Sequence, residues 1–301
     1  MALLTVEHLT KQFGSFSAVR DVSFTVQEGV CATLLGPNGA GKTTTLNMIT
    51  GLSTPTSGTI ALGDGYTLDR RHHLGYLPQH PSFFNWMSAE EYLRFSGELA
   101  GLTRQEANER ARVLLGKVGL DDAARKRIAG FSGGMKQRLG IAQALIHKPA
   151  LVILDEPVSA LDPFGRREVL DLMQELKKET SILFSTHVLN DAEQVSDDVY
   201  MMKGGSLVMS GSLTEVQASF ERPVIHLATA LPIGEWLDGK SSATWITSVE
   251  ASELGATLGV TDIAEARDAL LNDNALRALG ITRFEVGRKS LEDVFVEVMQ
   301  A

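Results

Sequence analysis

The sequence predicts an α/β fold: a mostly parallel sheet covered by helices, followed by a second, smaller α/β domain. Continuous apolar runs occur at 30–36 (VCATLLG) and 150–157 (ALVILDEP), a pattern typical of strands buried on both faces. A helical pattern at 164–179 separates the second run from another strand-like segment at 180–187, which gives β-α-β alternation. The 301 residues are enough for one large domain and one small one.

Composition and charge narrow the function classes. Apolar residues make up 44% of the chain and charged residues 22%, which is ordinary for a globular protein. The formal net charge is -9, whereas a nucleic-acid-binding protein normally carries a basic surface, so we expect no nucleic-acid partner. The single cysteine, Cys31, excludes an intrachain disulfide, and its apolar surroundings favour a buried, inert thiol over a reactive one.

Targeting signals are not recognisable in the sequence. The N-terminus lacks the basic stretch and following apolar stretch of a signal peptide. No apolar run approaches the roughly 18 residues that a membrane span needs. We therefore expect a soluble, cytoplasmic chain.

The first strands and helices follow from their periodicity. Residues 3–13 and 18–27 alternate apolar and polar side chains, as half-buried antiparallel strands do. A helix is predicted at 42–51, then a turn and another strand at 56–65. Helices at 89–101 and 103–120 each open with a capping-box candidate, formed by Ser88 with Glu91 and by Thr103 with Glu106.

The predicted domain boundary lies near residue 220, where the pattern changes. We expect a first domain over 1–219, with a helical subdomain at about 85–145, and a small α/β accessory domain over 220–301. The small domain is predicted from strands at 222–229 and 281–288 and helices at 262–279 and 290–300.

A phosphate-binding loop is predicted between a buried strand and a helix. Residues 36–43 fit the pattern G-x-x-x-x-G-K-[ST], in which glycines let backbone N–H groups face phosphates. A purely structural turn is the alternative, and the strand-loop-helix context favours a nucleotide site. Lys42 would reach the β/γ-phosphates, and the Thr43 hydroxyl would ligate Mg²⁺. The expected nucleotide-binding residues here are Gly36, Pro37, Asn38, Gly39, Ala40, Gly41, Lys42, Thr43 and Thr44.

Two acidic residues at the end of the run LVILDEP have the chemistry needed to bind Mg²⁺ and to activate water beside the phosphate loop. Asp155 is placed to hold Mg²⁺ through water, and Glu156 to act as general base toward an attacking water. Alone, Asp-Glu-Pro after a strand is more typical of the start of a loop. The presence of the phosphate loop favours the catalytic interpretation instead. Gln79 and His187 also follow strand-like runs, where parallel sheets bind ligands. His187 would reach the γ-phosphate and Gln79 the metal or the water, although a lone loop Gln or His is usually solvated.

A second phosphate-binding element is predicted at 131–138, FSGGMKQR. Ser132, Gly133 and Gly134 open a helix, so their N–H groups and the serine hydroxyl suit a γ-phosphate. One ATP-binding domain has no obvious use for two such elements.

The chain resembles the ATP-binding cassette (ABC) ATPases in six segments that occur in the family's order. These are GPNGAGKTT, PQ, FSGGMKQR, LVILDEP, SALD and STH, and the resemblance spans about residues 1–215. It implies a P-loop NTPase cassette with an antiparallel β subdomain, a mostly parallel RecA-like core and a helical subdomain.

The resemblance also explains the second phosphate-binding element. In this family, the Ser-Gly-Gly segment serves the ATP bound to a partner subunit, which implies a head-to-tail homodimer with two shared ATP sites. It further implies that Phe13 stacks on adenine, with a buried core aromatic as the alternative, and that Asp162 connects the two sites. Departures from the family pattern are Met135 for Gln, Phe13 for Tyr and Val158 for Thr, and none removes a phosphate, metal or base function.

The family resemblance implies a membrane partner. The segment from Gln79 to Met87 includes Phe83, Phe84 and Trp86, which would dock a helix of a separate permease, with buried packing as the alternative. The C-terminal segment from Ser290 resembles cassette subunits of ABC-2 type exporters, which handle drugs, antibiotics, lipids or polysaccharides; an ordinary helix cap by Ser290 and Asp293 is the alternative. An ATP hydrolase on the inner face of the cell membrane is expected. An importer subunit and a soluble ABC ATPase remain alternatives.

Overall fold

The computed structural model describes residues 1–63, 69–159, 161–219, 223–240 and 243–288. The chain divides into two compact units, Met1–Leu213 and Thr214–Ala301. The predicted helix at 290–300, with its predicted cap of Ser290 and Asp293, lies outside the described residues.

The first unit begins with a three-stranded antiparallel sheet in the order β2-β1-β4. Its strands are β1 (Ala2–Phe13), β2 (Phe16–Gln27) and β4 (Ser57–Leu62). Strand β1 pairs antiparallel with both neighbours, so the prediction from alternating side chains is confirmed. One face of this sheet is buried by Leu4, Val6 and Leu9, which are each at most 1% exposed.

A six-stranded sheet in the order β5-β6-β7-β3-β8-β9 forms the centre of the unit. Its strands are β3 (Cys31–Leu35), β5 (Leu74–Leu77), β6 (Leu151–Asp155), β7 (Ser181–Thr186), β8 (Asp198–Lys203) and β9 (Ser206–Ser212). Only the β8–β9 pairing is antiparallel. Every residue of β3, β6 and β7 is buried, which confirms the predicted mostly parallel sheet.

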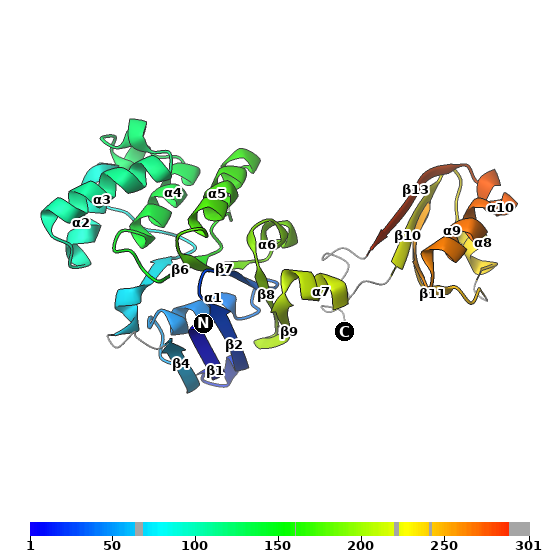
Figure 1. Cartoon of the computed structure of the whole chain (residues 1–301), viewed down its shortest axis with the longest axis horizontal. Helices are drawn as coiled ribbons and strands as arrows, with labels where there is room; N and C mark the ends of the chain where they lie inside the picture. Colours follow the sequence, from blue (N-terminus) through cyan, green and yellow to red (C-terminus); the bar gives the residue numbers. More distant parts are fainter. Residues whose placement is uncertain (64–68, 160, 220–222, 241–242, 289–301) are drawn as a thin grey trace. The chain divides into compact units, whose positions relative to one another are not determined.

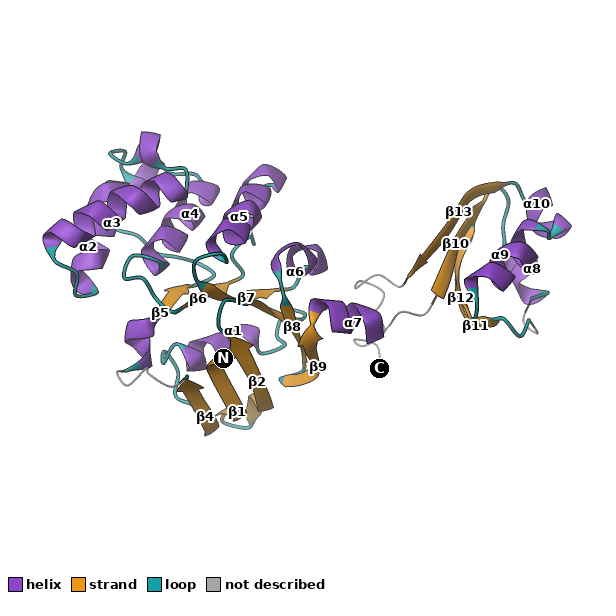
Figure 2. Ribbon diagram, in the orientation of Figure 1, coloured by secondary structure: helices purple, strands orange, loops and turns teal. Residues whose placement is uncertain are grey.

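Helices surround this sheet, as Figures 1 and 2 show. They are α1 (Lys42–Ile49), α2 (Ala89–Leu99), α3 (Arg104–Lys117), α4 (Gly133–Ala144), α5 (Pro163–Leu176) and α6 (Leu189–Val195), with short 3-10 turns at Arg70–His73, Asp121–Ala123 and Ile128–Gly130. Both predicted capping boxes are present at the starts of α2 and α3. No helix among the described residues is long and apolar enough to cross a bilayer.

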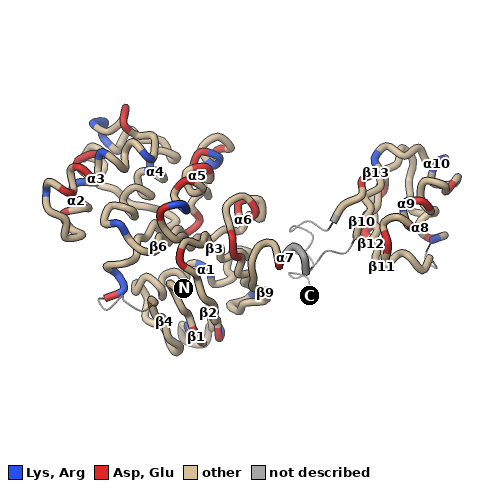
Figure 3. The backbone as a smooth tube through the Cα atoms, in the orientation of Figure 1, with Lys and Arg blue, Asp and Glu red and all other residues tan. Residues whose placement is uncertain are grey.

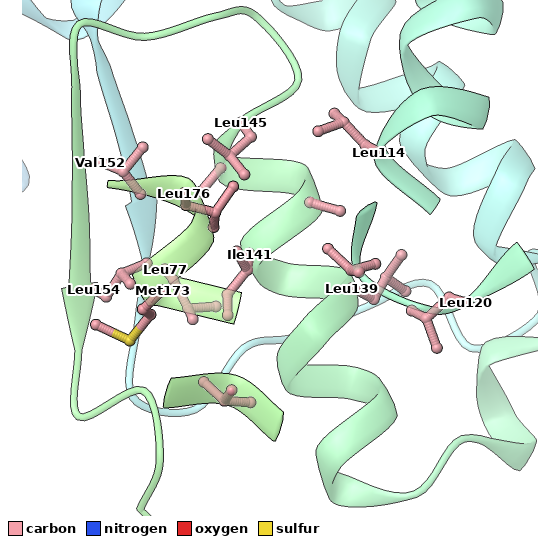
Figure 4. Packing of buried hydrophobic residues seen from close by; sticks show 14 of the residues in the cluster. Leu77, Leu114, Leu120, Leu139, Ile141, Leu145, Val152, Leu154, Met173 and Leu176 are labelled. Atoms are coloured by element: carbon pink, nitrogen blue, oxygen red, sulfur yellow. The ribbon is translucent and has the colours of Figure 1, made fainter. Parts of the chain in front are cut away.

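Two apolar cores hold the layers together. One lies between the antiparallel sheet, α1 and the central sheet. The other joins the central sheet to α2–α5, and Figure 4 shows Leu77 and Leu154 of the sheet facing Ile141 and Met173 of the helices. Cys31 belongs to this second core, and burial raises the pKa of its thiol far above the usual range. The predicted burial of this cysteine is therefore confirmed, and a raised thiol pKa is consistent with an inert side chain.

The second unit is a split β-α-β-β-α-β arrangement. Its elements are β10 (Pro223–Thr229), α8 (Gly234–Asp238), β11 (Ile246–Ser252), β12 (Gly255–Val260), α9 (Ile263–Leu271), α10 (Asn274–Ala278) and β13 (Ile281–Arg288), with α7 (Leu213–Ser219) at its start. The strands form an antiparallel sheet in the order β11-β12-β10-β13. Helices α8, α9 and α10 cover one face of it (Figure 2), and the α/β class predicted for this part is confirmed.

Details of the second unit differ from the predictions. The helical stretch predicted at 262–279 breaks into α9 and α10, because Asp273 accepts hydrogen bonds from the N–H groups of Ala275 and Leu276 and so caps a new helix. Strands β11 and β12 were not expected from the sequence. Most of β11 is exposed and polar. In β12, Ala256, Leu258 and Val260 alternate and are buried, but Gly255 and Gly259 weaken the strand signal of this short segment.

Candidate functional site

The predicted phosphate loop connects the end of β3 to α1, with backbone conformations that its glycines permit. Gly39 and Gly41 have φ of 81° and 101°, in the left-handed region. A Cβ on Gly36 would lie 2.3 Å from the carbonyl oxygen of Met202, so only glycine fits there without movement. Pro37, Asn38 and Gly39 are exposed at the tip of the loop. The N-terminus of α1 therefore opens toward an accessible loop of backbone N–H groups, as phosphate binding requires.

Lys42 is anchored inside this loop. Its ammonium donates hydrogen bonds to the carbonyl oxygens of Gly36 at 2.7 Å and Pro37 at 3.2 Å, and it lies 3.3 Å from Glu156 Oε1. The Lys42 and Glu156 side chains are each 5% exposed. A buried cation is thus held by the loop and by the carboxylate that follows β6.

Asp155, the last residue of β6, lies beside the start of α1. Its Oδ1 accepts hydrogen bonds from the hydroxyls of Thr43 at 3.1 Å and Ser185 at 2.6 Å. Its Oδ2 is buried and has no hydrogen-bond partner among the described residues. Burial raises the pKa of Asp155 above its usual range, and the neighbouring Glu156 adds to the rise. Hydrogen bonds from Ser185 and Thr43 oppose this rise.

Glu156 connects the lysine to a histidine from the next strand. Its Oε2 lies 2.6 Å from Nδ1 of His187, and an ionised carboxylate only accepts hydrogen bonds, so Nδ1 carries the proton. Glu156 also has a φ of 50°, which is uncommon for a residue other than glycine. Such backbone conformations concentrate at functional sites. With Nδ1 engaged, Nε2 of His187 is the ring nitrogen left for a ligand.

Ser185 is a site residue that sequence reasoning missed. Its hydroxyl donates to Asp155 Oδ1 at 2.6 Å and accepts from the Glu156 N–H at 2.9 Å, so it orients both acids. Parallel pairing of β6 and β7 sets Ser185 beside Asp155. The sequence signal for it was a polar residue directly after the apolar run ILF of this strand.

Other predicted residues lie on separate elements. Ser132 caps α4 by accepting a hydrogen bond from the Met135 N–H at 3.2 Å, and Gly133 and Gly134 form the first turn. Asp162 caps α5 in the same way through the Gly165 N–H at 2.8 Å. Within the described part of the chain, no hydrogen bond or ion pair joins Ser132–Gly134 to residues 36–44.

Phe13 and Gln79 are accessible. Phe13, at the end of β1, is 55% exposed, with the Lys11 ammonium 5.0 Å from its ring centroid. This exposure removes the alternative that Phe13 is a buried core aromatic. Gln79 is exposed in the loop after β5. Thr44 lies in the first turn of α1, next to Thr43.

The aromatic segment after Gln79 is partly exposed. Phe84 and Trp86 are 48% and 68% exposed, with ring centroids 6.1 Å apart, whereas Phe83 and Met87 pack against the core. Phe84 also lines a groove of about 470 Å³ between α2 and the end of α4, together with Phe95 and Leu99. Leu99 is 72% exposed. The predicted apolar surface is present, and buried packing accounts for only part of it.

Comparisons with known proteins agree with this geometry. The family described as "ABC transporter" matches residues 19–159. The family described as "ATP-binding protein DrrA1-3-like, C-terminal domain" matches residues 211–299. The first match contains the phosphate loop, the helical subdomain and both acids, and the second contains the split β-α-β-β-α-β unit.

Three bacterial relatives cover nearly the whole chain. The uncharacterized ABC transporter ATP-binding protein YxlF of Bacillus subtilis (strain 168) is 50% identical over 99% of this chain and 100% of its own length. The linearmycin resistance ATP-binding protein LnrL of the same organism is 31% identical over 98% of both chains. The bacitracin transport ATP-binding protein BcrA of Enterococcus faecalis is 33% identical over 99% of this chain and 96% of its own.

Solved structures resemble the first unit. The ATP-binding subunit of an ABC transporter has a TM-score of 0.63 and 34% identity, covering 72% of this chain and 93% of its own. A dimeric ATP-binding cassette in a post-hydrolysis state, bound to ADP and phosphate, has a TM-score of 0.62 and 25% identity, covering 70% of this chain and 99% of its own. These structures are cassettes of the fold described above.

Proposed function

Because this chain belongs to the family of ABC transporter ATP-binding proteins, we propose that it powers an ABC-2 type exporter whose permease is a separate protein. The chain is an ATP-binding subunit and an ATP hydrolase coupled to transport. Export is supported by the DrrA-like C-terminal domain and by relatives named for linearmycin resistance and bacitracin transport. Drugs, antibiotics, lipids and polysaccharides are the substrate classes proposed.

The main structural support for ATP hydrolysis is the cluster of Lys42, Glu156 and His187. Glu156 lies between the lysine of the phosphate loop, at 3.3 Å, and the histidine after β7, at 2.6 Å. In phosphoryl transfer the protein chiefly positions and stabilises charge. Glu156 takes a proton from the attacking water, whose oxygen bonds to the γ-phosphorus as the bond to ADP breaks. His187 orients the Glu156 carboxylate, and its Nε2 faces the γ-phosphate.

Magnesium fits the oxygen atoms at the start of α1. Mg²⁺ prefers oxygen ligands and is usually bound by one or two protein groups together with substrate phosphates. The buried Oδ2 of Asp155, which has no hydrogen-bond partner in the described part of the chain, and the neighbouring Thr43 hydroxyl are such groups. Thr43 would ligate the ion directly, Asp155 through water and Gln79 from its loop. When bound, the ion would neutralise phosphate charge.

The remaining site residues suit a shared ATP site. Ser132–Gly134 form the N-terminus of α4, and among the described residues no hydrogen bond or ion pair joins them to the phosphate loop. ABC cassettes dimerise on ATP, as in the related post-hydrolysis dimer. In a head-to-tail homodimer, Ser132–Gly134 would bind the γ-phosphate of the partner's ATP, while Asp162 connects the two sites and Phe13 stacks on adenine.

The exposed aromatic segment is the proposed permease contact. Phe84 and Leu99 line an apolar groove, and the exposed Trp86 ring lies 6.1 Å from the Phe84 ring, so this surface suits the apolar face of a permease helix. Docking there would place the chain in the cytoplasm, held to the inner face of the membrane by its partner. Gln79 lies in the same loop and would connect the permease contact to the nucleotide.

Hydrolysis by the purified full-length chain tests the enzyme. Wild-type protein should release phosphate from Mg·ATP, and Lys42→Ala should lose nucleotide affinity, because the point charge at the β/γ-phosphates is gone. Absence of hydrolysis by the wild-type chain at any protein concentration would reject the proposal.

Fractionation of the native cells tests the membrane contact. The wild-type chain should sediment with membranes, whereas the double variant Phe84→Ala/Trp86→Ala should move to the soluble fraction with its ATPase intact. Leu254→Ala is the matched control, since Leu254 is 48% exposed in the other unit. Equal sedimentation of all three proteins would reject docking at this groove.

A further inference from the structure

A buried aspartate lies just beyond the site residues. Asp191, in the first turn of α6, is 1% exposed. Its Oδ1 accepts a hydrogen bond from Arg166 Nε at 2.8 Å, and Nη2 of the same guanidinium lies 2.6 Å from Oδ1 as an ion pair. Its Oδ2 accepts from the Thr186 hydroxyl at 3.2 Å. A buried charge requires such partners, and this carboxylate uses both of its oxygens.

The partners of Asp191 come from two functional segments. Arg166 lies in the first turn of α5, and its N–H donates to the carbonyl of Asp162 at 2.9 Å. Thr186 immediately precedes His187, and its carbonyl accepts from the Gly36 N–H of the phosphate loop at 3.3 Å. Asp191 thus connects the start of α5 with the end of β7. Figure 3 marks basic residues on α5 and acidic residues on α6, the two helices that it joins.

We propose that Asp191 and Arg166 are positioning residues for ATP hydrolysis, an inference that rests on the proposed function. Neither residue touches the reacting atoms. Together they hold Thr186, and through the backbone His187, in a fixed position relative to the N-terminus of α5. His187 Nδ1 thereby stays within hydrogen-bond distance of Glu156 Oε2. A change at the Asp162 cap, which would face the partner subunit, is transmitted to the general base by the same contacts.

The neighbouring ion pair between Lys177 and Asp197 offers a matched control. It joins the far end of α5 to the segment after α6, with Lys177 Nζ 2.9 Å from Asp197 Oδ1. The Lys177 side chain is 26% exposed, close to the 34% of Arg166. Among the described residues, the other side-chain hydrogen bonds of this pair involve no site residue: Lys177 Nζ donates to the carbonyl of Val195, and Asp197 Oδ2 accepts from the N–H of Cys31.

The experiment compares steady-state ATP hydrolysis by full-length Asp191→Asn, Arg166→Lys and Lys177→Gln proteins with the wild type. Asp191→Asn should lower kcat about tenfold, because a displaced catalytic group slows turnover steeply. Its KM for Mg·ATP should stay within about twofold, because the nucleotide contacts are unchanged. Arg166→Lys keeps the charge without the planar two-point contact and should give an intermediate kcat. Lys177→Gln should leave kcat unchanged.

A second comparison separates positioning from stability. Thermal melting of each variant shows whether it folds. In a protein that already carries Glu156→Gln, adding Asp191→Asn should not lower kcat further, because both changes affect the same step. If folded Asp191→Asn and Arg166→Lys proteins have the kcat of the wild type, the inference is overturned and the proposed function is not affected. The inference is also overturned if Asp191→Asn and Lys177→Gln both lose kcat in proportion to the fall in their melting temperatures. An inactive wild-type chain overturns the inference and the proposed function together.

Discussion

The Nδ1 atom of His187 lies 2.6 Å from Oε2 of Glu156, so the histidine after β7 holds the acid that follows β6. Glu156→Gln removes the proton acceptor but keeps the shape of the side chain. Its turnover of ATP should fall by about 10²–10⁴-fold, the range for a general base. Nucleotide affinity should remain near that of the wild type, because Lys42 and the loop N–H groups are intact. Phosphate release and equilibrium ATP binding measure the two quantities.

His187→Ala is the companion variant, with the carboxylate retained and its orienting partner removed. Its kcat should also fall, with ATP binding retained. If Glu156→Gln kept most of the wild-type turnover, Glu156 would not be the base. If His187→Ala alone kept it, the contact between the two side chains would have no part in the reaction.

Ser132→Ala tests the shared ATP site. The change removes both the helix cap of α4 and a proposed γ-phosphate ligand. Losing the cap should lower the free energy of unfolding by about 1 kcal/mol. In dimers that contain one Ser132→Ala subunit, the site that holds the other subunit's ATP should lose activity. Single-turnover kinetics of mixed dimers resolve the two sites.

Thr103→Ala is the matched control for that variant. Thr103 caps α3 through the Glu106 N–H at 3.3 Å, and it lies outside the proposed site. It should lose a similar amount of stability with no effect on either ATP site. Equal effects of the two variants on hydrolysis would assign Ser132 to helix capping alone.

Asp155→Asn should stabilise the nucleotide-free protein while removing its response to Mg·ATP. Asp155 is 1% exposed, and burial raises its pKa, so the ionised carboxylate destabilises the folded state. A raised folded-state pKa gives stability that is present below the unfolded pKa and lost as pH rises through the folded value. At neutral pH the variant should gain about 1 kcal/mol, on the scale of one buried polar group.

The pH dependence provides the check on Asp155→Asn. The stability difference between variant and wild type should vanish below about pH 4, where the unfolded carboxyl is also protonated. Urea unfolding at several pH values without nucleotide measures this difference. A variant less stable than the wild type at neutral pH would contradict the account of Asp155 as a site built for a cation.

Contiguous motifs made much of the site predictable from the sequence. The phosphate loop, Asp155 and Glu156 lie within short segments whose chemistry depends on local backbone conformation. Contacts between strands were not predictable in this way. Ser185 reaches Asp155 only because β6 and β7 pair in one particular register, and the contact from Arg166 to Asp191 spans two helices.

The fold of the second unit was harder to predict than that of the first. Buried parallel strands such as β6 carry continuous apolar runs, which are easily recognised. In contrast, β11 is largely exposed, and β12 is a short strand with glycine at two of its six positions, although Leu258 and Val260 are buried in the core. The break at Asp273 depends on a local cap within a continuous helical pattern.

The most direct test of the account is the mass of the full-length Glu156→Gln protein in solution with Mg·ATP, with ADP and without nucleotide. This variant should bind ATP without consuming it, so any ATP-dependent assembly persists during the measurement. The account predicts a dimer with Mg·ATP and a monomer in the other two conditions, because Ser132–Gly134 of one copy bind the γ-phosphate held by the other. The same mass in all three conditions would contradict it.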